Sequence, residues 1–190
     1  MYKISVSDAF TPESLSKKLA ALPEWRRLKA LRYRRPIDQY LCAEAYLLLQ
    51  QGVAEVFGID CPAGEFAYGP YGKPFFENLS GVHFNISHCE KCVCCVVADE
   101  PVGIDVEAVC LHPELTEQVC SAAELEAIRL SGNPAEEFTK VWTRKEAYLK
   151  LRGEGIRTNM REVCPPEAEV EFCTTVNAER GYVLTLARRR

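Results

Sequence analysis

The sequence predicts an α+β fold made of two lobes of similar composition, each with helices first and strands after. Helical patterns dominate residues 11–57 and 121–152, whereas short apolar runs between turn signals occupy residues 82–109 and 169–190. Strands and helices do not alternate one by one, so a doubly wound parallel sheet is not expected. With 190 residues, of which 47% are apolar, the chain can bury a core. We place the lobe boundary between residues 100 and 101.

The N-terminal lobe, residues 1–100, opens with a predicted strand, YKISVSD, and a helix over residues 11–23 that Thr11 or Ser14 should cap. After the strongly basic residues 24–35, Pro36 begins a long helix that should end at Gly58. Apolar side chains recur along it at helical spacing and should face the core: Tyr40, Leu41, Ala45, Leu48 and Leu49. Residues 59–81 are rich in Gly and Pro and predict loops with short extended pieces.

Three short strands, VHFNIS, CVCCVVAD and VGIDVEAV, are predicted between residues 82 and 109 and are expected to form a meander. The C-terminal lobe, residues 101–190, continues with a helix over residues 121–131, where Ser121 and Glu124 have the spacing of a capping box. The clearest helix of the chain then runs from Pro134 to its stop at Gly153. EVEFCTTV and GYVLTLARRR supply two more strands.

Composition excludes several classes of protein. The segment MYKISVSDAF has no basic region followed by an apolar one, so it is not read as a signal peptide, and no apolar run has the length of a membrane span. The net charge of −4 gives no overall attraction to nucleic acid or to acidic lipid. We therefore expect a cytoplasmic protein that binds neither.

Ten cysteines suggest either metal binding or disulfides. Cys89 and Cys92 form a CxxC pair, but no second pair at the spacing of a zinc site follows. Cys92 and Cys94 alternate along a predicted strand, which is typical of cysteine used as a small buried hydrophobe. Because no secretion signal is present, disulfides are not expected either. The sequence favours reduced, structural thiols.

Two pairs of charged residues are candidates for chemistry. Asp105 and Glu107 lie two apart on a predicted strand, so both point to one face with Cα atoms roughly 6.5–7 Å apart. They either line a face open to water or converge on a hard cation such as Mg²⁺, which takes carboxylate and phosphate oxygens. Glu146 and Lys150 share a helix face one turn after Trp142, and a surface ion pair within the helix is the alternative there.

Polar residues before that strand suggest contacts with phosphate. Ser87 and His88 in FNISH point to opposite faces of a strand, so a hydrolase triad is not expected. Both either donate hydrogen bonds to a phosphate or are simply structural residues at the strand end. Lys73 sits in a Gly-Lys-Pro turn that should hold it in a fixed loop. The basic residues 26–35 are either a solvated helix face or a nucleic-acid surface, although no stacking aromatics interleave them.

Four motifs occur in a fixed order between residues 72 and 150: GKP, FNISH, GIDVE and WTRKEAYLK. Their order and residues closely resemble the 4′-phosphopantetheinyl transferase superfamily, in particular its surfactin-synthetase type. The resemblance implies transfer of the 4′-phosphopantetheine arm of coenzyme A to a serine of an acyl or peptidyl carrier protein, with release of 3′,5′-ADP. It also implies a fold in which two similar α/β lobes of one chain are related as a pseudo-dimer, with the active site in the cleft between them. The protein is then expected to be a monomer.

The same resemblance implies a role for each candidate residue. Asp105, Glu107 and Glu146 would hold Mg²⁺, and Glu146 would also accept the proton of the carrier serine, directly or through a water. Lys150 would steady the leaving group at the pyrophosphate. Lys145 and His88 would each contact a phosphate, and Ser87 would support the edge that His88 forms. The 3′-phosphate side would be held by Lys73, Arg26 and Lys29.

The resemblance weakens toward the C-terminus, where the chain is short for this type after residue 160. Local basic residues 26–35 could dock the acidic helix that carrier proteins present beside the modified serine. Two other classes of function stay open at this point. One is a catalytically idle relative that only binds carrier protein or coenzyme A, and the other is a small nucleic-acid-binding domain that uses residues 26–35.

Overall fold

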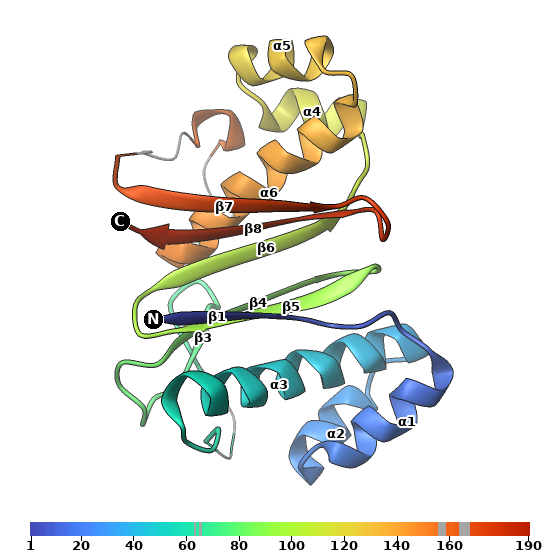
Figure 1. Ribbon diagram of the computed structural model, residues 1–190, viewed down its shortest axis with the longest axis vertical. Coiled ribbons are helices and arrows are strands. Elements are labelled where there is room, and N and C mark those ends of the chain that lie inside the picture. Colours follow the sequence, from blue (N-terminus) through green and yellow to red (C-terminus); the bar gives the residue numbers. More distant parts are fainter. Residues whose placement is uncertain (63, 65, 156–158, 164–167) are drawn as a thin grey trace.

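The computed structural model describes residues 1–62, 64, 66–155, 159–163 and 168–190 and has the expected α+β fold (Figure 1). In the first half the elements are β1 (Tyr2–Val6), α1 (Pro12–Ala21), α2 (Glu24–Ala30), α3 (Pro36–Phe57), β2 (Ala67–Tyr68), β3 (Pro74–Phe75), β4 (His83–Cys89) and β5 (Cys92–Ala98). In the second half they are β6 (Val102–Ala108), α4 (Pro113–Val119), α5 (Ala122–Leu130), α6 (Pro134–Arg152), the 3₁₀ turn η1 (Met160–Glu162), β7 (Val170–Asn177) and β8 (Tyr182–Arg189).

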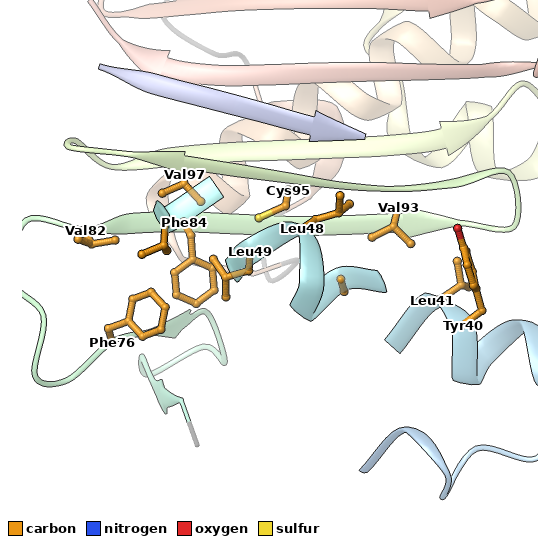
Figure 2. Close-up of a cluster of buried hydrophobic side chains, with 12 residues drawn as sticks. Tyr40, Leu41, Leu48, Leu49, Phe76, Val82, Phe84, Val93, Cys95 and Val97 are labelled. Atoms are coloured by element: carbon orange, nitrogen blue, oxygen red, sulfur yellow. The ribbon is translucent and has the colours of Figure 1, made fainter. Parts of the chain in front are cut away.

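The first antiparallel sheet has the strand order β1-β5-β4, and α3 crosses one of its faces (Figure 1). Thr11, one of the two capping residues that the sequence offered, caps α1 through a capping box with Ser14. Gly58 ends α3 in the left-handed conformation, at the predicted position. The apolar side chains predicted to face the core from α3 are all buried there. Figure 2 shows Tyr40, Leu41, Leu48 and Leu49 against Phe84, Val93, Cys95 and Val97 of the sheet.

The second antiparallel sheet has the order β6-β8-β7, and α6 packs on β6 and β8. Close packing depends on Gly103, because a Cβ at this position would lie 2.0 Å from the carbonyl oxygen of Ala147 and 2.3 Å from the amide nitrogen of Leu151. Both atoms belong to the α6 backbone, so glycine lets the helix approach the strand directly. The predicted capping box of Ser121 with Glu124 is present at the start of α5.

The predicted three-strand meander is wrong. β4 and β5 form a hairpin, but β6 pairs with β8 instead of continuing the first sheet. The free edge of β5 is taken by β1, whose Tyr2 lies opposite Ala98. This pairing joins segments far apart in the chain, which local strand signals do not reveal.

β6 runs beside β4 (Figure 1). Side chains of β4 join the two strands. The side-chain oxygen of Asn85 accepts a hydrogen bond from the Ile104 amide at 2.8 Å, and Ser87 Oγ accepts one from the Val106 amide at 3.4 Å. The two sheets also share a core between them. It includes Cys92 and Cys94, buried as the strand pattern predicted.

Within the described residues, no helix is both long and apolar enough to cross a membrane.

Candidate active site

Asp105 is the buried centre of a polar group where β4, β6 and α6 meet. Its side chain is 2% exposed. Its Oδ1 accepts a hydrogen bond from Ser87 Oγ at 2.8 Å and lies 2.6 Å from Lys150 Nζ, which also donates to Ser87 Oγ at 2.9 Å. The ion pair of Lys150 therefore spans from α6 to β6, and Lys150 and Ser87 hold one oxygen of Asp105 in place.

Glu107 and Glu146 complete a set of three carboxylates with Asp105. Burial, the charge of Asp105 and that of Glu107 raise the pKa of Glu146 to about 7, even though Lys150 opposes the shift. Burial and then Asp105 raise the pKa of Glu107 as well. The charge of Asp105 contributes to both shifts, so Glu107 and Glu146 each lie close enough to Asp105 to be repelled by it.

The same carboxylates have oxygens that lack partners among the described residues. Asp105 Oδ2 and Glu146 Oε1 are buried and accept no hydrogen bond there. Buried carboxylate oxygens without donors are costly, and a hard divalent cation such as Mg²⁺ binds just such oxygens. In the described part of the chain, no three His, Cys, Asp or Glu side chains are already arranged as a metal site. The donor chemistry thus fits Mg²⁺, whereas the side chains would have to turn toward it.

A basic cavity of about 340 Å³ is formed by residues of the N-terminal half of the chain. Its lining includes Arg26 and Lys29 of α2 and His88 of β4. Arg26 is 6% exposed, and its guanidinium carbon lies 5.2 Å from the Tyr46 ring centroid. Its Nε has no hydrogen-bond partner among the described residues. A buried guanidinium with a donor to spare is suited to an anion such as phosphate.

A second cavity of about 260 Å³ adjoins the basic cavity and is lined by one of the three carboxylates. Its lining includes Glu146 and Lys150 of α6, and it shares Pro74 and Ile86 with the basic cavity. Ser87 and His88 do point to opposite faces of β4, as expected, because Ser87 bonds to Asp105 whereas His88 lines the basic cavity. One strand thus contributes to both parts of the site.

Lys145 requires a correction, because the structure does not place it toward this site. Its side chain is 1% exposed and its Nζ donates to the carbonyl oxygens of Val119 and Met160, at 2.9 and 2.8 Å, and to Glu124 Oε2 at 2.8 Å. Neighbouring helix positions point about 100° apart, so Lys145 faces α5 and η1 while Glu146 faces β6. The predicted phosphate contact is not compatible with these bonds.

Lys73 also has a different placement from the one predicted. Its Nζ donates to the carbonyl oxygens of Val102 at 2.8 Å, Lys150 at 2.6 Å and Leu151 at 3.3 Å. Burial lowers its pKa to about 8. Lys73 therefore ties its loop to β6 and to the C-terminal carbonyls of α6, where a cation is favoured. A 3′-phosphate contact would require these bonds to break.

Two residues that the sequence did not single out as site residues hold the carboxylate strand in position. Trp142 Nε1 donates to Glu107 Oε1 at 3.4 Å, and Asn85 holds the Ile104 amide next to Asp105. Trp142 stands one turn before Glu146 on α6, so the helical spacing was a usable signal for it. Asn85 lies within FNISH, but its partner on β6 becomes visible only in three dimensions.

Known proteins resemble the chain over much of its length. Residues 101–186 match the model of the 4′-phosphopantetheinyl transferase superfamily. A 4′-phosphopantetheinyl transferase of Bacillus subtilis is 29% identical over 146 residues, which cover 74% of this chain and 64% of that protein. The 4′-phosphopantetheinyl transferase gsp of Aneurinibacillus migulanus is 31% identical over 129 residues, which cover 66% of this chain and 54% of that protein.

A eukaryotic relative matches a longer part of the chain. The L-aminoadipate-semialdehyde dehydrogenase-phosphopantetheinyl transferase of Saccharomyces cerevisiae is 30% identical over 167 residues, which cover 82% of this chain and 60% of that protein. The chain thus spans between about half and two thirds of the length of these relatives.

Proposed function

We propose that the chain is a member of the 4′-phosphopantetheinyl transferase superfamily and that it transfers 4′-phosphopantetheine from coenzyme A to a serine of an acyl or peptidyl carrier protein. The second product is 3′,5′-ADP. The observation that carries the proposal is the contact of Lys150 with Asp105 beside the unpartnered oxygen of Glu146. All three residues lie within the stretch that matches the family model.

The proposed phosphate-binding groups come from both lobes, residues 1–100 and 101–190, with the active site in the cleft between them. Arg26, Lys29 and His88 would bind the phosphates of coenzyme A in the basic cavity. Lys150 would steady the 3′,5′-ADP that leaves when the pyrophosphate linkage of coenzyme A breaks, since Lys150 lines the second cavity. Lys145 and Lys73 are left out of the phosphate contacts, because backbone carbonyls already occupy their donors.

The proposed metal ligands are Asp105, Glu107 and Glu146, which would hold Mg²⁺. When bound, this ion would neutralise charge on the phosphoryl oxygens of the substrate. Glu146 would also take the proton of the carrier serine, directly or through a water. Ser87 would act indirectly, because it fixes the Asp105 carboxylate by a hydrogen bond.

The proposed partner is a carrier protein that presents an acidic helix. On and just after α2, Arg27, Arg32 and Arg34 are exposed beside the basic cavity, and they would attract such a helix over a Debye length. We further propose that the enzyme acts as a monomer in the cytoplasm. A nucleic-acid-binding role is not favoured, because the net charge is −4.

Intact-mass measurement of carrier proteins tests the activity. Apo acyl carrier protein and an apo peptidyl carrier domain are incubated separately with the protein, coenzyme A and Mg²⁺. We expect one of them to gain one phosphopantetheine, and EDTA to abolish the gain. If neither gains mass while the protein still binds coenzyme A, the catalytically idle alternative is correct.

A pair of matched variants tests the site. Glu107→Gln keeps an oxygen for Trp142 but removes the charge, so transfer should fall at least about 100-fold while coenzyme A affinity changes little. Glu126→Gln, on the exposed side of α5, should transfer at the wild-type rate. Wild-type turnover of Glu107→Gln at saturating Mg²⁺ would remove Glu107 from the proposed metal ligands.

A further inference from the structure

The hairpin between β4 and β5 places two cysteines face to face at its closed end. Cys89 is the last residue of β4, Cys92 is the first of β5, and the strand register pairs them directly across the two-residue turn of Glu90 and Lys91. Directly opposed residues of antiparallel strands have Cα atoms about 4.5 to 5.5 Å apart. Disulfides require about 4.4 to 6.8 Å. The backbone therefore already brings this pair within bridging distance.

The surroundings favour this pair over other thiol pairs. Both cysteines are reduced, Cys89 is half-buried at the turn, and Cys92 is 2% exposed behind it. The neighbouring thiol of Cys94 is fully buried and donates to the Ser87 carbonyl oxygen at 3.5 Å. Among the described residues, no group of three His, Cys, Asp or Glu side chains is arranged to hold a metal ion.

The two thiols also differ in acidity: the more accessible thiol, Cys89, has the lower pKa, which is what a reactive cysteine requires. A hydrogen bond from the Cys92 thiol, helped by backbone amides of the turn, lowers the pKa of Cys89 to about 7 although burial opposes it. The same hydrogen bond and burial raise the pKa of Cys92. Cys89, the more accessible of the two, therefore carries the thiolate that reacts with oxidants.

We propose that Cys89 and Cys92 are a redox modification site and form a reversible disulfide when the protein meets a peroxide. The Cys89 thiolate attacks one peroxide oxygen, the O–O bond breaks, and the departing hydroxide takes a proton and leaves as water, which makes a sulfenic acid. The Cys92 sulfur then loses its proton and attacks the Cys89 sulfur, the S–O bond breaks and a second water leaves. Two electrons pass from the sulfurs to the peroxide, and a dithiol reductant restores both thiols.

The position of the bridge gives it a consequence that rests on the proposed function. His88, which precedes Cys89, lines the basic cavity with Arg26 and Lys29. A disulfide fixes the dihedral angle between its two residues, so it limits how far the end of β4 that carries His88 can adjust to a bound phosphate. We expect the oxidised protein to bind coenzyme A several-fold more weakly than the reduced protein.

Peptide mapping after titration with hydrogen peroxide tests the proposal without any reference to coenzyme A. Trypsin cuts after Lys91, so a bridge appears as two linked peptides, which dithiothreitol separates. Each peptide carries further cysteines, so fragmentation of the linked pair is needed to assign the bridge to Cys89 and Cys92. The exposed Cys173 on β7 serves as an internal measure of oxidant exposure. We expect the bridge in wild type and in Cys94→Ala. In Cys92→Ala, dimedone should trap the sulfenic acid on Cys89.

Three outcomes would overturn the proposal. One is oxidation of Cys173 while Cys89 and Cys92 both remain open to alkylation. Another is a bridge that maps to Cys94 or to a second molecule. The third is a bridge that still forms in Cys89→Ala. This variant also keeps the test decisive if Cys92→Ala fails to fold. A mapped bridge with unchanged coenzyme A affinity would leave the modification site standing and would contradict only the expected effect on binding.

Discussion

Replacement of Gly103 by alanine is the sharpest perturbation that the packing of α6 on β6 offers. The new Cβ would lie 2.0 Å from the Ala147 carbonyl oxygen, and real Cβ atoms essentially never approach a heavy atom closer than 3.0 Å. α6 must therefore move about 1 Å away from β6, and no flexible side chain can absorb the shift, because the obstructing atoms are backbone. Overpacking of this kind costs about 1–3 kcal/mol, and we expect a loss of about 3 kcal/mol in unfolding free energy.

The same displacement should also reduce activity. Glu146 and Lys150 travel with α6, whereas Asp105 stays on β6. A misplacement of about 1 Å in a catalytic group can cost about 100-fold in rate, so transfer to the carrier should fall by that order in Gly103→Ala. This second effect depends on the proposed function, whereas the loss of stability does not.

Urea denaturation of Gly103→Ala beside a matched glycine variant measures the effect. Gly132 is the control, because a Cβ there meets no heavy atom within 4 Å. Gly132→Ala should keep the wild-type unfolding free energy or gain up to about 1 kcal/mol. If Gly103→Ala unfolds within about 0.5 kcal/mol of wild type, the strand and helix do not pack as described, and the reasoning is wrong.

Three further variants separate structural from binding roles. Lys73→Met removes the donor to three backbone carbonyls, so the unfolding free energy measured by urea titration should fall by about 2–3 kcal/mol. The affinity for coenzyme A should be nearly unchanged, and a large loss of affinity would support the predicted phosphate contact of Lys73. Lys145→Met removes the donor to two backbone carbonyls and to the Glu124 carboxylate and should cost about 3 kcal/mol. Its control, the exposed Lys17→Met, should be neutral, and equal stability of the two variants would contradict the buried contacts. Trp142→Phe keeps the ring packing but frees Glu107, so steady-state turnover should fall several-fold at nearly constant stability, and unchanged turnover would make that hydrogen bond irrelevant.

Local patterns predicted the secondary structure well. Thr11 with Ser14 and Ser121 with Glu124 form the capping boxes that begin two helices. Pro134 and Gly153 bound α6 as predicted. A cap or a helix stop depends on residues within one turn, so a single sequence contains the information.

Pairings over long distances in the chain were not predictable in the same way. The three strands between residues 82 and 109 were found, but their meander was wrong, because β1 and β8 compete for the strand edges. α4 and η1 were missed as well, each being a single short segment. Strand partners are chosen by burial of whole faces, which a local pattern does not report.

The site divides along the same line. Glu107 and Asp105 sharing a strand face, and Glu146 and Lys150 sharing a helix face, follow from the repeat of each element, so the sequence by itself determined these pairs. Only the tertiary structure decided that Lys150 contacts Asp105 and that the ammonium groups of Lys145 and Lys73 donate hydrogen bonds to backbone carbonyls. A lysine side chain reaches several partners, and the one it binds is fixed by which element is packed beside it, so its role cannot be read before the fold is known.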